Sequence, residues 1–351
     1  MKVIHIESGL GNQMLSYCEL LALRKVNPTD DFYLETIVYD IPECNDTICQ
    51  WNGFELKRVF NICEPNIAQI FKEEEWENII QEIRLTKFWD HNWNWPVYFE
   101  QVFQAHGLNI HNAIGDFEAK GCNKKTASTK GPSFKDSIRN LTIYQYLHSK
   151  KIHQQYLRIA PTYSNEAIHF LKSEENLLAG QRLTFKNIGS GIEQIEKDIR
   201  KAFIFTENYE ERNASALKEI HSCNAVAIHA RRGDMLGSNY DCYKFGYFQR
   251  CMKYIKSQVP NPVFYIFCDP DSVSWAKNNA PILGLDIKRD AIRFVDWNKG
   301  LDSYRDMQLM AACKHQVITR SSFGWWGAWL NEYPGKITCS PDPLINTTHH
   351  F

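Results

Sequence analysis

Short apolar runs alternate with amphipathic stretches along the C-terminal half of the chain. Apolar runs bounded by polar turns are typical of buried strands, and apolar residues that recur once per helical turn are typical of helices. The pattern predicts strands at residues 224–231, 262–268, 292–295, 316–319 and 336–339, with helices at 247–257, 273–279, 304–312 and 325–331. Regular alternation of strand and helix is the signature of a parallel, doubly wound sheet. We therefore expect an α/β fold for this half.

The N-terminal half opens in a similar way. Residues 2–7 are predicted to form a buried strand, residues 9–12 a tight loop, residues 14–26 a helix and residues 32–39 a second strand. Residues 40–120 are irregular and rich in tryptophan, and no period stands out there. The start therefore favours a βαβ unit, and the middle of the chain has no assigned fold.

We place the domain boundary where a helical pattern resumes after the irregular middle of the chain. Residues 120–136 are dense in Gly, Ser, Thr and Lys, which marks a surface loop. The pattern is helical from residue 193 to residue 221. We predict two α/β halves, an N-terminal domain at 1–195 and a C-terminal domain at 196–351. Ligands of such folds bind where strands end and helices begin, so the expected site is a cleft between the halves.

Composition excludes several classes of protein. The 351 residues carry a formal net charge of -1, with 44% hydrophobic and 23% charged residues, so nothing suggests disorder or general binding of nucleic acid. The 11 cysteines show no Cys-x-x-Cys pair and no zinc-ligand spacing, as expected of reduced thiols. Residues 1–7 are too polar for a signal peptide, and no run of about 18 apolar residues occurs. We expect a soluble cytoplasmic chain with at most peripheral association with the inner face of the membrane.

Charge gathers where one predicted strand ends. Residues 225–234 read Ala-Val-Ala-Ile-His-Ala-Arg-Arg-Gly-Asp. Because strand side chains alternate between faces, His229 and Arg231 are predicted to point one way and Arg232 the other. A guanidinium donates two parallel hydrogen bonds and stays charged, which suits a pyrophosphate. We predict Arg231 as the ligand residue, with Arg232 as its support and Asp234 as a candidate partner of Arg232; a structural Arg–Asp network is the alternative.

A second segment joins a predicted strand to a predicted helix. Residues 319–330 read Thr-Arg-Ser-Ser-Phe-Gly-Trp-Trp-Gly-Ala-Trp-Leu. Serine hydroxyls and free backbone N–H groups at a helix N-terminus form an anion site, so Ser321 and Ser322 are candidates for the other side of a diphosphate. The alternative is an N-cap followed by an aromatic core stripe, and for the three tryptophans we prefer that interpretation.

Two further segments carry weaker signals. Residues 8–14, Ser-Gly-Leu-Gly-Asn-Gln-Met, lack the third glycine of a dinucleotide fingerprint, which disfavours NAD; Gly11, Asn12 and Gln13 remain candidates for the ligand site through their amide groups. Residues 269–271, Asp-Pro-Asp, resemble the acidic pair that holds a metal in many sugar-nucleotide enzymes. Because this spacing is common, we prefer turn chemistry or a single contact of Asp269 with a nucleotide.

Taken together, these segments resemble the family 11 glycosyltransferases, the α-1,2-fucosyltransferases. The resemblance rests on residues 9–14, on His229-Ala-Arg-Arg-Gly-Asp234, on residues 321–330 and on residues 296–315. It implies a GT-B-like fold of two Rossmann-like doubly wound domains, with the acceptor side in 1–195 and the GDP-fucose side in 196–351. It also implies GDP-β-L-fucose as donor, inversion to an α linkage, transfer to the 2-hydroxyl of galactose and no metal requirement.

The resemblance also assigns site residues. The first arginine of His-x-Arg-Arg-x-Asp grips the donor diphosphate in related enzymes, and this arginine corresponds to Arg231. His229 and the Ser321-Ser322-Phe323 segment are implied to line the donor site. The sequence departs from the family at Arg320, where asparagine is usual, at Gly324, where serine is common, and at residues 269–271, where Ser-Asp-Asp is more usual.

The general base and the acceptor are left open. Asp234, next to the donor motif, and Glu7, at the end of the first strand, are both candidate bases. The expected acceptor is a galactose-containing oligosaccharide or glycolipid, and its identity is unknown. Alternative functions are a fucosyltransferase of another linkage, α-1,6 or protein O-fucosylation, and a glycan-binding relative that has lost catalysis and stacks sugars on Trp89, Trp93 and Trp95.

Overall fold

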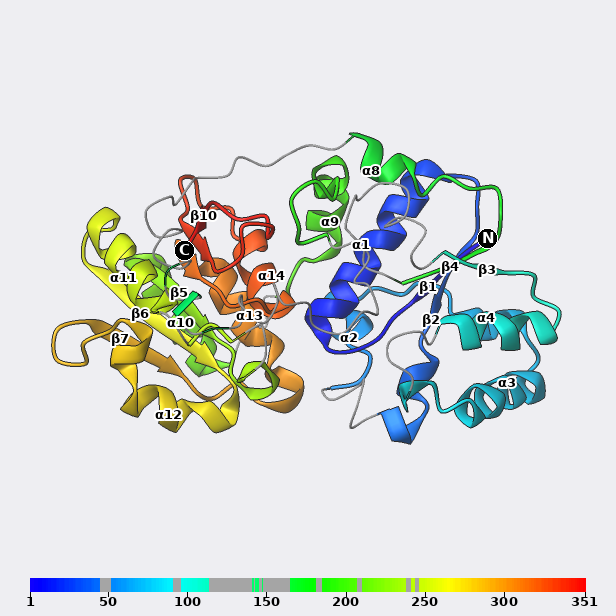
Figure 1. The fold of residues 1–351 in the computed structure, drawn as a ribbon, viewed down its shortest axis with the longest axis horizontal. Coiled ribbons are helices and arrows are strands. Elements are labelled where there is room, and N and C mark those ends of the chain that lie inside the picture. The colour runs from blue at the N-terminus through cyan, green and yellow to red at the C-terminus, as the bar shows by residue number, and fades with distance from the viewer. Residues whose placement is uncertain are drawn as a thin grey trace. The chain divides into compact units, whose positions relative to one another are not determined.

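The computed structural model is shown in Figure 1. It describes residues 1–44, 52–90, 96–113, 165–180, 185–206, 210–237, 241–243 and 246–351, together with positions 141, 143, 144 and 147. Within these ranges the chain forms two compact units, each with its own parallel sheet. No helix in the described part is long and apolar enough to cross a bilayer.

The first unit contains the described residues within 1–124 and 162–206. Its sheet has four strands in the order β2-β1-β4-β3, and each described pair is parallel. The strands are β1 Lys2–His5, β2 Phe32–Glu35, β3 His111–Asn112 and β4 Leu177–Ala179. The helices are α1 Leu10–Val26, α2 Leu56–Phe60, α3 Glu73–Leu85, α4 Pro96–Ala105, α8 Asn165–His169 and α9 Glu196–Ala202. Most of α1 is buried on every side, as expected for a helix inside a layered fold.

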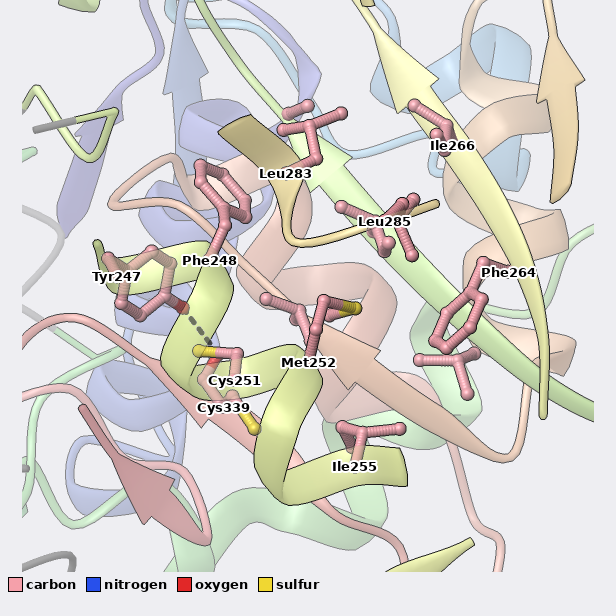
Figure 2. Packing of buried hydrophobic residues seen from close by; sticks show 14 of the residues in the cluster. Tyr247, Phe248, Cys251, Met252, Ile255, Phe264, Ile266, Leu283, Leu285 and Cys339 are labelled. Carbon is pink, nitrogen blue, oxygen red and sulfur yellow. Dashed lines mark hydrogen bonds between the residues drawn. The ribbon is translucent and has the colours of Figure 1, made fainter. Parts of the chain in front are cut away.

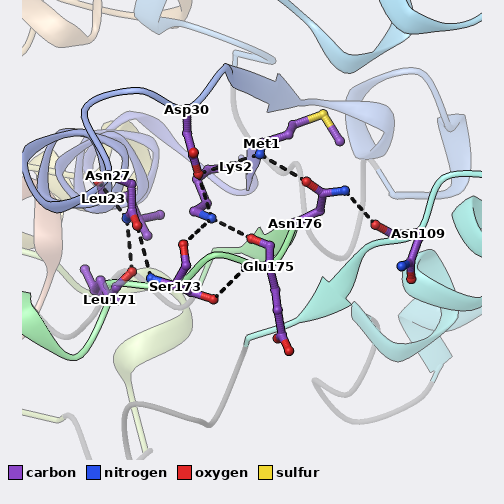
Figure 3. Close-up of polar contacts among 10 residues, drawn as sticks. All are labelled: Met1, Lys2, Leu23, Asn27, Asp30, Asn109, Leu171, Ser173, Glu175 and Asn176. Carbon is purple, nitrogen blue, oxygen red and sulfur yellow. Dashed lines mark hydrogen bonds and ion pairs between the residues drawn. The ribbon is translucent and has the colours of Figure 1, made fainter.

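The amino end of β1 is fixed by buried polar contacts, shown in Figure 3. Lys2 is fully buried, and its Nζ donates to the carbonyl oxygens of Ser173 at 2.9 Å and Glu175 at 2.5 Å. The same Nζ lies 2.7 Å from Oδ2 of Asp30, and this contact lowers the pKa of Asp30. Asn27, at the end of α1, accepts from the N–H of Ser173 at 3.0 Å. A buried charge is tolerated here because it is paired and hydrogen-bonded.

The second unit contains the described residues within 125–161 and 207–351. Its sheet has six strands in the order β10-β9-β8-β5-β6-β7, again with parallel pairs. The strands are β5 Asn224–Ala230, β6 Pro262–Cys268, β7 Ala291–Val295, β8 His315–Val317, β9 Thr338–Ser340 and β10 His349–His350. The helices are α10 Glu211–Ser222, α11 Tyr247–Gln258, α12 Val273–Asn278, α13 Tyr304–Ala312 and α14 Ser322–Leu330.

The core of the second unit forms where α11 covers the sheet, as Figure 2 shows. Tyr247, Phe248, Cys251, Met252 and Ile255 recur once per turn of α11 and are all buried in one cluster with residues of β5 and β6. The hydroxyl of Tyr247 lies 2.6 Å from the carbonyl oxygen of Ile318 and 3.0 Å from that of Cys339. This residue therefore joins the helix to the chain at the ends of β8 and β9.

The α/β class and the parallel, doubly wound sheet predicted for the C-terminal half are confirmed. The strand at 262–268 and the helix at 304–312 agree with the prediction to the residue. The helix predicted from residue 325 begins three residues earlier, because Ser321 caps it. The first unit ends at Thr206, whereas the sequence placed the boundary at 195, before α9.

Three predictions for the N-terminal half are corrected. The tight loop predicted at 9–12 is the first turn of α1, which begins at Leu10. The strand predicted at 32–39 ends at Glu35, and Ile37–Tyr39 form a 3-10 helix. The irregular region contains helices α2, α3 and α4. The loop predicted at 120–136 lies outside the described residues.

Candidate active site

The two sharpest sequence motifs meet at the centre of the six-stranded sheet. From β5 the chain builds β6 and β7 outward on one side, and β8 then returns to the other side of β5. Ligands of open parallel sheets bind outside the carboxyl ends of the strands at such a switch point. Arg231 follows β5, and Ser321 follows β8 after a short loop. The candidate site therefore lies at the carboxyl ends of β5 and β8.

Strand register places Arg231 beside Asp269. The last paired residues of β5 and β6 are Ala230 and Cys268, so the next residue of each strand stands side by side. Arg231 Nη1 donates to Oδ1 of Asp269 in a short ion pair. Oδ2 of the same carboxylate accepts the backbone N–H of Arg232 at 2.7 Å. The Asp269 contact predicted for a nucleotide is thus occupied by the two arginines in this structure.

Arg232 has a different environment from Arg231. Its guanidinium carbon lies 3.6 Å from the ring centroid of Trp275 and 5.8 Å from that of Tyr243. Tyr243 in turn donates from its hydroxyl to the carbonyl oxygen of Arg231 at 3.0 Å. These contacts fix the guanidinium of Arg232 against two rings, and its supporting role toward Arg231 stays a prediction. The side chain of Asp234, its predicted partner and a candidate base, lies outside the described residues.

Serine caps the helix that follows β8. Ser321 is the N-cap of α14, and its hydroxyl accepts the backbone N–H of Phe323 at 3.3 Å. Ser322 is the first residue of the helix, and both serines are partly exposed. The helix N-terminus and its hydroxyls form an arrangement that favours an anion. Trp325 and Trp326 are buried, which confirms the aromatic core stripe expected for them.

His229 connects the two motifs. Its Nδ1 lies 3.1 Å from the hydroxyl of Thr319, and its ring centroid lies 5.9 Å from that of Phe323. Burial lowers the pKa of His229 to about 4, with opposing effects from Asp269, which raises it, and Arg231, which lowers it further. The imidazole is therefore neutral near pH 7 and adds no charge beside Arg231.

The residues predicted from the first glycine-rich segment lie in the other unit. Gln13 is fully buried, and its amide donates to the carbonyl oxygens of Ser8 and Gly53, each at 2.8 Å, while its Oε1 accepts the N–H of Glu55 at 2.8 Å. The sequence predicts that this amide faces a ligand. In the structure it instead hydrogen-bonds the backbone at residues 53–55. Gly11 is buried and Asn12 is partly exposed, both in the first turn of α1.

Glu7 lies directly after β1 beside a buried histidine. Its Oε2 is 3.9 Å from Nε2 of His5, whose Nδ1 makes a short hydrogen bond with Oε2 of Glu35. The side chain of Glu7 is only 2% exposed. A base must reach its substrate's proton, so Glu7 serves as one only if the acceptor enters this buried position. Its role stays a prediction.

A buried hydrogen-bonded cluster joins α10 to the family-like segment 296–315. Asn298 donates from Nδ2 to Oδ1 of Asp306 at 2.7 Å and pairs with Asn213 at 2.8 Å, and Trp297 Nε1 also donates to Asn213 at 2.8 Å. Desolvation raises the pKa of Asp306 to about 7, against the lowering effect of Asn298. Asn213 is the member that the sequence did not single out, because the packing of α10 against α13 brings it here.

Arg320, a departure from the family pattern, pairs with an acid near the C-terminus. Its Nε lies 3.9 Å from Oδ2 of Asp342. In the described part of the chain no group of three or more His, Cys, Asp or Glu residues is arranged to hold a metal ion. Trp89 is partly buried and packs against the hydrophobic core of the first unit. The other two proposed sugar-stacking tryptophans, 93 and 95, lie outside the described residues.

Comparison with known proteins connects this geometry to a family. The model of "Glycosyl transferase family 11" matches residues 146–342, more than half of the chain. An alpha-1,2-colitosyltransferase of Escherichia coli is 33% identical over 147 residues, which cover 40% of this chain and 48% of that protein. The O-antigen biosynthesis glycosyltransferase WbnK of E. coli is 32% identical over 127 residues, covering 34% of this chain and 39% of that protein.

More distant relatives extend the picture. The human galactoside alpha-(1,2)-fucosyltransferase 1 is 23% identical over 148 residues, covering 39% of each chain. Among solved structures, the fucosyltransferase NodZ from Bradyrhizobium aligns with a TM-score of 0.43 at 12% identity, covering 93% of this chain and 91% of that one. The chain matches less than half the length of these curated relatives.

Proposed function

The chain belongs to glycosyltransferase family 11, and from this premise we propose that it is an inverting fucosyltransferase. It moves L-fucose from GDP-β-L-fucose to the 2-hydroxyl of a galactose residue in an oligosaccharide or glycolipid, without a metal ion. One observation carries the proposal. A guanidinium and a serine-capped helix N-terminus stand at the carboxyl ends of β5 and β8, where a parallel sheet binds its ligand.

The chemistry follows from where negative charge develops. The acceptor oxygen attacks the anomeric carbon of fucose from the face opposite the diphosphate, and the bond to the diphosphate oxygen breaks. Its electron pair leaves with GDP. Arg231 and the N–H groups at the start of α14, with the hydroxyls of Ser321 and Ser322, stabilise that growing charge. This stabilisation supplies what a metal ion supplies in other nucleotide-sugar enzymes.

Two other roles are assigned to neighbouring side chains. Neutral His229 keeps Arg231 as the dominant charge at the end of β5 and packs against Phe323. The acceptor proton passes to a base, for which Glu7 and Asp234 are the candidates. An oxocarbenium-like transition state needs little help from a base, so neither carboxylate has to be essential.

A colitosyl donor is the second candidate, because the relative with 33% identity carries the name alpha-1,2-colitosyltransferase. The α-1,2 linkage is common to that name and to the galactoside fucosyltransferases. We prefer fucose because the motifs of this chain resemble the fucosyltransferases over its length. The other linkages, α-1,6 and protein O-fucosylation, share only the His-x-Arg-Arg-x-Asp motif.

The linkage is tested on the isolated product. The protein is incubated in EDTA with lactose and either GDP-fucose or GDP-colitose, and the trisaccharide is characterised by NMR. Fucose attached in α configuration to O2 of galactose supports the proposal. A product made only from GDP-colitose, a product linked elsewhere, or turnover that needs an added divalent cation overturns the corresponding part of it. If lactose is not used, a panel of galactose-terminated oligosaccharides and glycolipids separates a wrong acceptor from an inactive protein.

A further inference from the structure

One carboxylate holds both arginines of the motif at the end of β5. Asp269 pairs through Oδ1 with the guanidinium of Arg231, and through Oδ2 it accepts the backbone N–H of Arg232 at 2.7 Å. The pairing of Ala230 with Cys268 puts the next residues of the two strands next to each other, so the contact is built into the sheet. Asp269 therefore fixes the side chain of one arginine and the main chain of the next.

Both partners are largely shielded from solvent. The side chain of Arg231 is 15% exposed and that of Asp269 is 14% exposed. An unrestrained arginine side chain populates many rotamers, and an ion pair with little exposure restricts them before any ligand arrives. A guanidinium has five N–H donors, so one arginine side chain can in general bind a carboxylate and a phosphate together.

Two aromatic residues, Tyr243 and Trp275, also contact these arginines. Tyr243 donates to the carbonyl oxygen of Arg231 at 3.0 Å, and Trp275 lies under the guanidinium of Arg232 with its ring centroid 3.6 Å away. The two rings contact each other edge to face at 5.3 Å. The Arg232 N–H donates to Asp269 as well, so hydrogen bonds hold the backbone at both arginines.

Like charges argue against a direct contact of Asp269 with the donor. A carboxylate within contact distance of a diphosphate costs free energy unless a cation stands between them. Arg231 is such a cation, and it faces Asp269. We propose that Asp269 is a positioning residue, which acts on the nucleotide through the guanidinium of Arg231 and not by touching the nucleotide itself. This inference rests on the proposed function, because it assumes that Arg231 binds the diphosphate.

The inference predicts that the effects of the two residues are not additive. GDP binding is measured by titration calorimetry for the natural protein, Asp269→Asn, Arg231→Ala and the double variant. Asparagine keeps the shape but loses the charge that orients Arg231. We expect GDP affinity to fall about tenfold in Asp269→Asn, in line with the loss of one charge-assisted hydrogen bond. In the Arg231→Ala background the same change should not weaken binding, because no guanidinium is left to position.

Controls separate positioning from damage to the fold. Asp271→Asn alters the exposed second acid of the same Asp-Pro-Asp segment and should leave GDP affinity unchanged. Thermal unfolding of every variant identifies any that do not fold, and Asp269→Glu, which keeps the charge on a longer stem, should recover part of the lost affinity. Steady-state kinetics give a second readout, since a mispositioned Arg231 lowers kcat as well as raising KM for GDP-fucose.

The outcomes are distinct for the two proposals. Equal weakening by Asp269→Asn in both backgrounds would mean that Asp269 contacts the nucleotide directly, and it would overturn the positioning role. Unchanged affinity in Asp269→Asn would overturn it as well. Absence of GDP binding by the natural protein would instead contradict the proposed function, from which the inference starts.

Discussion

The ring of His229 packs so closely against Gly324 that no side chain fits at position 324. A Cβ built on Gly324 would lie 2.3 Å from Nδ1 and 2.7 Å from Cγ of the His229 ring. The family commonly has serine at this position, so the histidine of this chain sits closer to α14 than a serine would allow. We expect Gly324→Ser to displace His229 and to lower the free energy of unfolding by about 1–3 kcal/mol, the usual cost of overpacking.

Chemical denaturation of four proteins checks this contact. They are the natural chain, Gly324→Ser, His229→Ala and the double variant. If the ring is the obstacle, the serine costs less stability once His229 is alanine, and the two changes show a coupling energy. The same loss in both backgrounds would place the obstruction elsewhere and contradict the close packing described here.

Asp306 gives a pH dependence at the scale of one residue. Its pKa is about 7 in the folded protein against 3.8 for an ordinary aspartate, because desolvation disfavours the charged form. A raised pKa in the folded state means that the stability it contributes is complete below pH 3.8 and is lost as the pH rises to about 7. We expect unfolding free energies to show the natural protein losing up to about 4 kcal/mol relative to Asp306→Asn over this range, since each unit of pKa shift corresponds to about 1.4 kcal/mol.

The informative quantity is the difference in unfolding free energy between the natural protein and Asp306→Asn at each pH, since other groups titrate in both proteins. Asparagine still accepts the hydrogen bond from Asn298, whose donor lies 2.7 Å from Oδ1 of Asp306. A difference that stays constant from pH 4 to pH 8 would show that Asp306 ionises normally and that its surroundings are well hydrated.

At the scale of elements, Tyr247 joins α11 to two strands beside the site. Its hydroxyl lies between the carbonyl oxygens of Ile318 and Cys339, at 2.6 Å and 3.0 Å, and the residue is buried. Tyr247→Phe leaves the Ile318 carbonyl without this donor, so we expect a loss of about 1–2 kcal/mol in unfolding free energy. Tyr254→Phe on the same helix is the matched control, because its hydroxyl contacts His349 at 2.9 Å at a partly exposed position. Equal losses for both would contradict the special role of Tyr247.

Lys2 makes a similar test for the first unit. Its buried Nζ contacts two carbonyl oxygens and Asp30, all at the amino end of β1. Lys2→Met keeps the volume but removes the lysine's contacts with those oxygens, so we expect a loss of about 2–4 kcal/mol, measured by urea unfolding. Asp30→Asn should cost less, since the lysine keeps its carbonyl partners. A smaller effect for Lys2→Met than for Asp30→Asn would show that the carbonyl contacts add little.

The sequence predicted elements best where their apolar period was complete. The run at 262–268 is an interior strand and α13 is an amphipathic helix, so burial alone defined both. β4 has three residues and β3 has two, too few for a period to emerge. β4 pairs with β1 and β3 pairs with β4, and both pairings join segments far apart in the chain. The range 325–331 began α14 three residues too late, whereas the serines of the same segment had already been placed at the helix N-terminus, where Ser321 is the N-cap.

At the scale of the whole molecule, the predicted site residues fall into two groups. His229, Arg231, Arg232, Asp269, Ser321, Ser322 and Phe323 all lie at the carboxyl ends of β5, β6 and β8 or at the start of α14. The motifs predicted this grouping because the carboxyl ends of all strands in a parallel sheet lie at the same edge. Gly11, Asn12, Gln13 and Glu7 lie in the first unit, and no sequence pattern indicated that Gln13 would be buried.

The role of Asp269 was the harder inference. Sequence reasoning offered a metal ligand, a turn residue or a nucleotide contact, and nothing in the Asp-Pro-Asp spacing pointed to Arg231. The partnership depends on strand register, which puts residues 38 positions apart in the chain next to each other. Register is set by the packing of whole strands, so it is not visible in a local motif.

The central claim is that Arg231 stabilises the departing GDP, and the most direct test compares GDP release from GDP-fucose by the natural protein, Arg231→Ala and Ser215→Ala in EDTA with a galactoside acceptor. Ser215→Ala is an exposed control on α10. The account predicts that folded Arg231→Ala loses about 2–4 kcal/mol of transition-state stabilisation, seen in kcat/KM, while the control keeps normal turnover. Near-normal turnover by folded Arg231→Ala would contradict it.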